Sequence, residues 1–72
     1  MSDALADRVR LRLRIEMAKR DLNTTQLAAL MGVSDMWLSR RLRGKTEIHV
    51  GDLDRLAVAL GVEVDQLLES AA

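Results

Sequence analysis

Basic residues are concentrated between residues 40 and 45, and they are the side chains with the clearest chemistry in the sequence. Arg40, Arg43 and Lys45 fall there, and no acidic residue interrupts the segment. Arginine can hydrogen-bond to guanine O6 and N7 together, and arginine and lysine both neutralise phosphates. The segment therefore indicates a nucleic-acid contact, against the alternative of solvated charge on a helix surface.

The formal charge of the 72-residue chain is zero, but the charges are unevenly distributed. Residues 1–45 contain ten Lys and Arg and five Asp and Glu, whereas residues 46–72 contain one Arg and six acids. Such a chain can present a basic face to a polyanion although its charges cancel overall. The distribution favours a polyanionic partner.

Catalytic and metal-binding side chains are scarce. His49 is the only histidine, the chain has no cysteine, and Asp52 and Asp54 point apart at positions i and i+2 of a helix. This pattern offers no nucleophile–base pair, metal-ligand cluster or glycine-rich phosphate loop. We therefore expect no enzyme, and no cofactor, metal or small-molecule substrate.

The sequence also points away from membranes and from oxidising compartments. It has no run of about 18 uncharged apolar residues, which a membrane span would need, and no cysteine for disulfides. We expect no membrane contact and a cytoplasmic location at the nucleoid.

Four glycines and the apolar periodicity predict an all-α fold of five helices in one domain, residues 1–72. The expected helices cover about 4–20, 24–31, 35–43, 50–60 and 64–69. Residues 9–15 alternate strictly between apolar and polar, as a half-buried strand would. Good helix formers flank this segment, so we favour a helix there.

Local signals mark the ends of the second and third expected helices. Asn23 and Gln26 have the spacing of a capping box, and Gly32 suits a left-handed C-cap. Ser34 is then expected to cap the next helix. Two short helices joined by so tight a turn form the plan of a helix-turn-helix.

Residues 22–34, LNTTQLAALMGVS, resemble the helix-turn-helix core of lambda-repressor-like, or Cro-type, DNA-binding domains. Further similarities are Leu38-Ser39-Arg40, Gly44-Lys45 and LAVALGV at 56–62. The block at 37–44 is most similar to actinobacterial and actinophage members. The resemblance covers roughly residues 9 to 69. It implies a compact five-helix bundle that binds operator DNA, usually as a homodimer, and usually represses transcription.

Three features depart from the pattern of this family. Thr24 stands where many relatives have a glutamine that contacts phosphate. Met17 and Leu42 stand where relatives pair an arginine with a glutamate, and an apolar pair can replace such an ion pair at little cost. Arg41 stands where relatives often have a core residue, so the interior contact is expected at Leu42.

The helix-turn-helix plan assigns roles to residues 24–46. Base readout is expected from Asp35, Met36 and Arg40, although Asp35 could instead only favour the positive end of its helix. Trp37 and Ser39 flank these residues and could touch DNA, whereas a lone tryptophan more often belongs to the core. Phosphate contacts are expected from Thr24, Thr25, Ser34, Arg41, Arg43, Lys45 and Thr46.

The leading hypothesis is a sequence-specific transcriptional regulator, expected to be a repressor, that inserts helix 35–43 into the major groove of double-stranded operator DNA as a homodimer. A protein-interaction module, such as an antitoxin or a regulatory subunit, is the alternative. It would explain the zero net charge and the apolar stripe of Leu11 and Ile15. A ribbon-type DNA binder would require residues 9–15 to be a strand.

Overall fold

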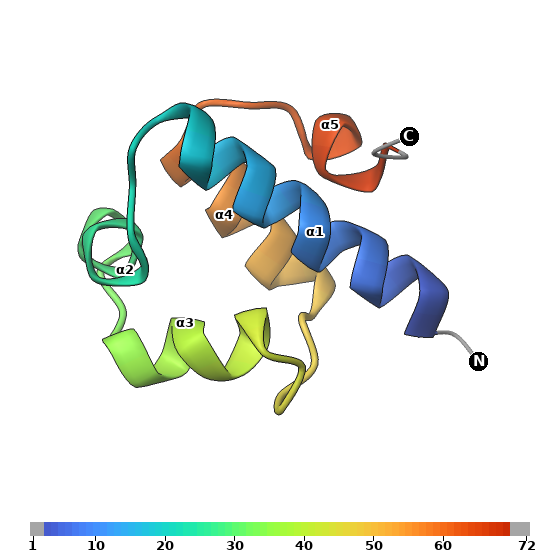
Figure 1. Ribbon diagram of the computed structural model, residues 1–72, viewed down its shortest axis with the longest axis horizontal. Coiled ribbons are helices and arrows are strands. Elements are labelled where there is room, and N and C mark those ends of the chain that lie inside the picture. The colour runs from blue at the N-terminus through green and yellow to red at the C-terminus, as the bar shows by residue number, and fades with distance from the viewer. Residues whose placement is uncertain (1–2, 70–72) are drawn as a thin grey trace.

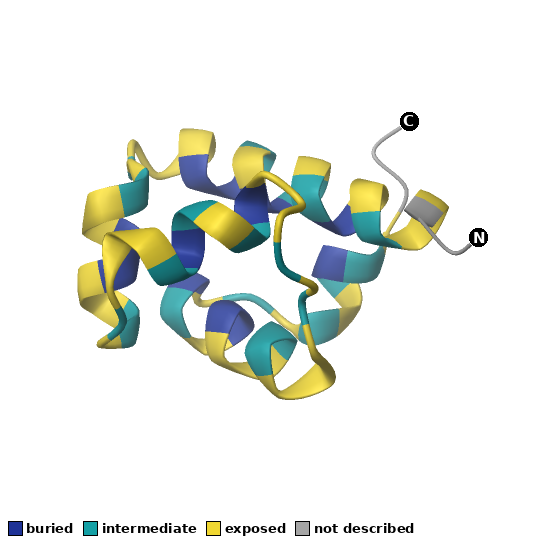
Figure 2. Ribbon diagram, turned by 90° about the horizontal axis from the view of Figure 1, so that it is seen from below, coloured by how far each residue is buried: buried dark blue, intermediate teal, exposed yellow. Residues whose placement is uncertain are grey.

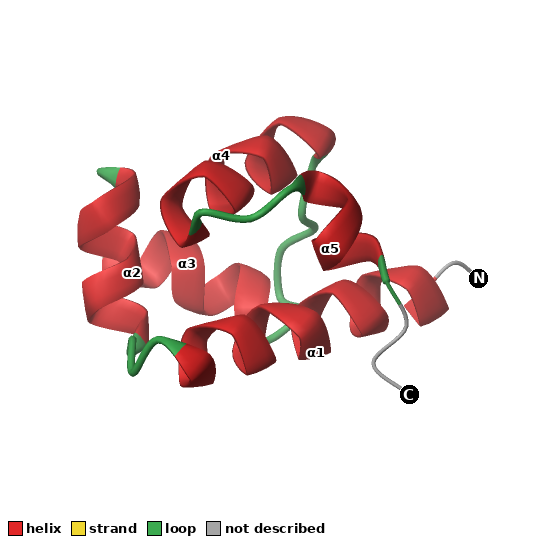
Figure 3. Ribbon diagram, turned by 90° about the horizontal axis from the view of Figure 1, so that it is seen from above, coloured by secondary structure: helices red, strands yellow, loops and turns green. Residues whose placement is uncertain are grey.

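Five helices account for most of residues 3–69, the part of the chain that the computed structural model describes. They are α1 (Asp3–Lys19), α2 (Thr24–Met31), α3 (Asp35–Leu42), α4 (Val50–Leu60) and α5 (Val64–Leu68) (Figure 1). Loops join them, and this part of the chain contains no strand (Figure 3). The all-α prediction is confirmed, and each observed helix end lies within one residue of the expected one. Residues 9–15 lie inside α1, so the strand alternative is wrong.

The ends of the central helices follow the local signals in the sequence. The Asn23 side chain accepts a hydrogen bond from the Gln26 N–H at 2.8 Å, and the Gln26 side chain accepts one from the Asn23 N–H at 2.9 Å. This reciprocal pair begins α2. Gly32 ends α2 at a φ of 72°, a left-handed conformation that glycine adopts without steric cost. Ser34 Oγ accepts from the Trp37 N–H at 3.0 Å and begins α3.

Each helix contributes one leucine without exposed surface to the core. These are Leu13, Leu27, Leu38, Leu56 and Leu67. Figure 2 shows the buried residues gathered on the inner sides of the helices and the exposed ones outside. Met17 and Leu42 are also buried in this cluster, at 7% and 4% exposure, as expected if an apolar pair replaces the ion pair of relatives. The helices are therefore held together mainly by apolar burial.

The arrangement of the helices leaves the outer side of α3 uncovered. In Figure 1, α5 lies at the top and α3 at the bottom, with α1 and α4 between them. Residues 35, 36 and 40 of α3 are exposed, whereas Leu38 and Leu42 face the core. None of the helices in residues 3–69 has the length and hydropathy that crossing a membrane requires.

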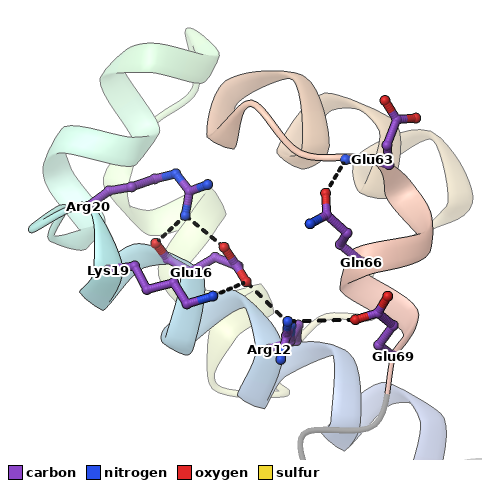
Figure 4. A network of polar contacts seen from close by, with 7 residues as sticks. All are labelled: Arg12, Glu16, Lys19, Arg20, Glu63, Gln66 and Glu69. Atoms are coloured by element: carbon purple, nitrogen blue, oxygen red, sulfur yellow. Dashed lines mark hydrogen bonds and ion pairs between the residues drawn. The ribbon is translucent and has the colours of Figure 1, made fainter.

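A buried carboxylate on α1 was not predicted from the sequence. Glu16 is 2% exposed and lies among three cations: Arg20 Nη1 at 2.7 Å, Lys19 Nζ at 3.3 Å and Arg12 Nε at 3.4 Å (Figure 4). Arg12 also reaches the Glu69 carboxylate at 3.7 Å, just after α5. The surrounding positive charge offsets the cost of burying Glu16.

Acidification is expected to weaken the fold through Glu16. The Arg20 hydrogen bond lowers the pKa of Glu16 below its ordinary value of 4.5, against the opposing effect of burial, and Lys19 adds to the lowering. A pKa lowered by folding stabilises the protein above the unfolded-state pKa, and this stability is lost as the pH falls through the folded-state pKa. Glu16→Gln is therefore expected to cost about 1–3 kcal/mol of unfolding free energy at neutral pH and much less in acid.

Thermal unfolding followed by circular dichroism at neutral pH and at about pH 3 measures this difference. Glu47→Gln is the matched control, because Glu47 is exposed and forms no ion pair within residues 3–69. An equal deficit of Glu16→Gln at both pH values would contradict the role of its charge.

Candidate nucleic-acid interface

The turn between α2 and α3 is short and closely packed. Ala28 is 1% exposed, and its carbonyl accepts a hydrogen bond from the Val33 N–H at 3.0 Å. In addition, Thr25 Oγ1 donates to Asp35 Oδ2 at 2.6 Å. This bond joins the first turn of α2 to the first turn of α3. The angle between the two helices is thus fixed both by packing and by a polar contact.

An open groove lies along the exposed side of α3 and brings together residues that the sequence assigned to DNA. Its lining comprises Thr24, Asp35, Met36, Ser39, Arg40, Arg43 and Lys45. All three residues expected to read bases are in this set. Met36 is 60% exposed and Arg40 is exposed, so both side chains can reach a ligand in the groove.

The cations of the groove keep their charge available to a ligand. Arg40, Arg43 and Lys45 form no ion pair with any carboxylate in the described part of the chain. Arg43 donates from Nε and Nη2 to Ser39 Oγ at 3.1 and 2.9 Å. The neutral Ser39 hydroxyl therefore orients the Arg43 guanidinium without neutralising it.

Arg41 lies on a different side of α3 from the groove. Its side chain is 14% exposed and donates to Asp52 Oδ2 at 3.2 Å and to the Trp37 carbonyl at 3.1 Å. Its Cζ also lies 3.7 Å from the centre of the Trp37 ring, a cation–π geometry. Trp37 is partly buried against the core and does not line the groove. The flank of α3 that carries Trp37 and Arg41 thus packs toward α4.

The partner of Arg41 was missed from the sequence. From the sequence, Asp52 and Asp54 are only two carboxylates that point apart and hold no metal ion together. Burial raises the pKa of Asp52, but the His49 N–H and the Arg41 guanidinium together hold it below its ordinary value of 3.8. The signal that could have found this pair is the opposite charge of Arg41 and Asp52, but the sequence does not show that α3 and α4 bring them together.

The remaining predicted phosphate ligands lie around the groove. Thr24 lines it, whereas the Thr25 and Ser34 side chains are engaged in the bonds described above and are exposed. Thr46 is partly buried, and its N–H donates to the Arg40 carbonyl at 3.3 Å. Their contacts with phosphate stay predictions.

Asp35 is the one carboxylate in the lining of the groove, and a group of three others lies at α5. Glu63, Asp65 and Glu69 belong to α5 and the residues that flank it, and all three are exposed. Because α5 and α3 lie on opposite sides of the molecule (Figure 1), these carboxylates are separated from the cations of the groove.

Comparison with known proteins agrees with this geometry. Residues 8–70 match a family model described as a helix-turn-helix domain. The chain belongs to this family. No curated protein matches the helix-turn-helix chain by sequence. The family is one of DNA-binding domains, which supports a regulator rather than an enzyme.

Two solved structures resemble this helix-turn-helix domain over most of its length. A hypothetical transcription factor, NHTF, from Neisseria has 24% sequence identity and a TM-score of 0.87, with 93% of this chain and 77% of that chain covered. The clp gene regulator ClgR from C. glutamicum has 30% identity and a TM-score of 0.80, with 89% and 83% covered. Both structures share the fold of this domain, and ClgR has the higher sequence identity to it.

Proposed function

We propose that this helix-turn-helix protein is a sequence-specific regulator of transcription that inserts α3 into the major groove of double-stranded DNA. The observation that carries the proposal is the groove along α3, where exposed cations that pair with no carboxylate of residues 3–69 adjoin exposed side chains that can contact base edges. A major groove about 12 Å wide admits an α-helix and presents a different pattern of donors and acceptors for each base pair. Membership in a helix-turn-helix family supports the same mode of binding.

Three side chains of α3 read the bases in this proposal. Arg40 hydrogen-bonds to guanine O6 and N7, and Met36 makes an apolar contact with a thymine methyl group. Asp35 accepts from cytosine N4 through the oxygen that Thr25 does not occupy.

Phosphate contacts come from Arg43, Lys45 and the first turn of α2. The N–H groups at the start of a helix favour an anion, and Thr24 adds a hydroxyl there. Arg41 is left out of this set, because its guanidinium already binds Asp52 and covers Trp37. Two copies acting as a repressor would occupy two half-sites about 10 base pairs apart.

Selection of bound DNA from a random double-stranded pool tests this function. We expect one enriched sequence, arranged as two inverted half-sites. Recovery of no DNA, even at low salt, would refute DNA binding and favour the alternative of a protein-interaction module. The structural support for that alternative is Leu11, an apolar side chain that is 49% exposed.

Lys45→Ala is expected to weaken binding to every DNA sequence by a similar factor. The reason is that a phosphate contact carries no base information. The slope of log affinity against log salt should become shallower by about 0.9 for the lost contact. Lys19→Ala is the matched control, because Lys19 is the other lysine of the chain and lies beside Glu16, away from the groove. Equal slopes for the two variants would remove Lys45 from the phosphate contacts.

A further inference from the structure

We propose that Arg10 and Arg14 of α1 are positioning residues for the DNA interface, because they hold the C-terminal end of α3 and the turn that carries Arg43 and Lys45. The proposal deepens the function proposed above and rests on it. Neither arginine lines the groove, so their effect on DNA passes through α3.

Both arginines donate to backbone carbonyls at the end of α3. Arg10 Nε lies 3.1 Å from the Arg41 carbonyl oxygen, and Arg14 Nη2 lies 2.9 Å from that of Leu42. The two arginines are four residues apart, so they project from the same face of α1. Two residues one turn apart on α1 are thus joined to two consecutive carbonyls of α3 by charge-assisted hydrogen bonds.

The backbone at the end of α3 leaves one carbonyl without a backbone donor within residues 3–69. The last four carbonyls of a helix, here those of residues 39–42, have no partner inside it. The N–H groups of residues 43–46 donate to the first three of these carbonyls. No backbone N–H within residues 3–69 donates to the Leu42 carbonyl, which accepts from Arg14 instead. Arg14 therefore satisfies the carbonyl that the turn leaves without a donor, and Arg10 adds a second donor to the Arg41 carbonyl, which also accepts from the Gly44 N–H.

Arg10 also supports the turn itself. Gly44 has a φ of 78°, and a Cβ placed on it would lie 3.3 Å from Arg10 Cζ. The guanidinium thus packs against the backbone that links Arg43 to Lys45. The Arg10 side chain is only 17% exposed, and its Nε and Nη1 are engaged within the protein, by the Arg41 carbonyl and by Asp7 at 2.9 Å.

Charge makes this arrangement useful for binding a polyanion. The C-terminal end of a helix carries a partial negative charge, which repels phosphate. The phosphates bound by Arg43 and Lys45 would meet that charge at the end of α3. The guanidinium groups of Arg10 and Arg14, which bind the Arg41 and Leu42 carbonyls, oppose this negative charge. They also fix the position of the turn.

Substitution by glutamine tests the positioning role, with Arg8→Gln as the matched control. Arg8 lies on the same helix, has the same charge and donates to a carbonyl at the end of α5, that of Leu68, at 3.3 Å. We expect Arg10→Gln/Arg14→Gln to bind the selected DNA site about tenfold more weakly and Arg8→Gln to bind it almost normally. The amides of Lys45 and Thr46 should exchange with solvent faster in the double variant without DNA. Arg14→Lys, which keeps a charged donor, should restore most of the affinity lost in Arg14→Gln.

A cycle with Arg43→Ala/Lys45→Ala separates positioning from direct contact. If Arg10 and Arg14 act through these two cations, the glutamine substitutions cost little further affinity once the cations are absent. An undiminished loss in that background would show direct phosphate contacts and overturn the positioning role. The positioning role would also be overturned if the glutamine double variant bound DNA as tightly as Arg8→Gln does.

Two controls keep this test separate from folding and from the proposed function. Arg14 is exposed and makes one of the two bonds, so Arg14→Gln alone serves if the double variant does not fold. The single variant should then show a smaller loss of affinity in the same direction, and no loss would overturn the role of Arg14. Failure of the unsubstituted protein to bind any DNA would instead refute the proposed function.

Discussion

Leu38→Ala is expected to lower the free energy of unfolding by about 2–5 kcal/mol. The Leu38 side chain has no exposed surface and lies on the inner face of α3, in contact with the shared core. Its truncation removes apolar contacts and leaves a cavity that a closely packed interior fills only in part. A 72-residue chain has little stability in reserve, so a loss of this size should unfold a measurable fraction of the protein.

Urea unfolding followed by circular dichroism measures the effect. Leu30→Ala is the matched control, because Leu30 is 61% exposed on the neighbouring helix and should change stability by no more than about 0.5 kcal/mol. Equal stabilities for the two variants would mean that Leu38 is not a core residue.

Arg40→Ala is expected to weaken binding to the selected DNA site by about 10- to 100-fold and to remove the preference for guanine at one position. Arg40 is exposed on the groove and has no carboxylate partner in residues 3–69, so the substitution should leave the fold intact. The loss differs in kind from that of Lys45→Ala, because it falls mainly on one base pair rather than on all sequences.

Competition binding with sites altered one base pair at a time detects this change. Arg8→Ala is the control, since Arg8 is an exposed arginine that does not line the groove. If Arg40→Ala keeps both the affinity and the base preference of the unsubstituted protein, Arg40 does not read DNA.

The helices and their ends could be predicted because their causes are local. Asn23 and Gln26 satisfy each other's backbone groups three residues apart, and Gly32 supplies the left-handed residue at the end of the same helix. The exposed side of α3 could be predicted as well, because Leu38 and Leu42 share one face at helical spacing and leave Arg40 on another.

Contacts between helices could not be predicted from the same signals. Arg41 resembles the basic residues beside it in the sequence, yet it binds Asp52 of α4. In the sequence Glu16 is one of several acids in a charged helix, yet in the structure it is buried among cations. Which charged residue turns inward depends on how the helices approach one another, and periodicity does not contain that information.

The separation of the groove cations from the carboxylates around α5 gives an electrically neutral molecule a polar axis. At a distance, a DNA backbone pulls weakly on such a molecule but exerts a torque that turns α3 toward it. In the proposed complex, the exposed Glu63 and Asp65 carboxylates lie on the side away from the duplex and would repel the phosphates of a second duplex within a Debye length of about 10 Å. For the proposed DNA complex, this arrangement of charge favours occupation of one duplex over bridging of two.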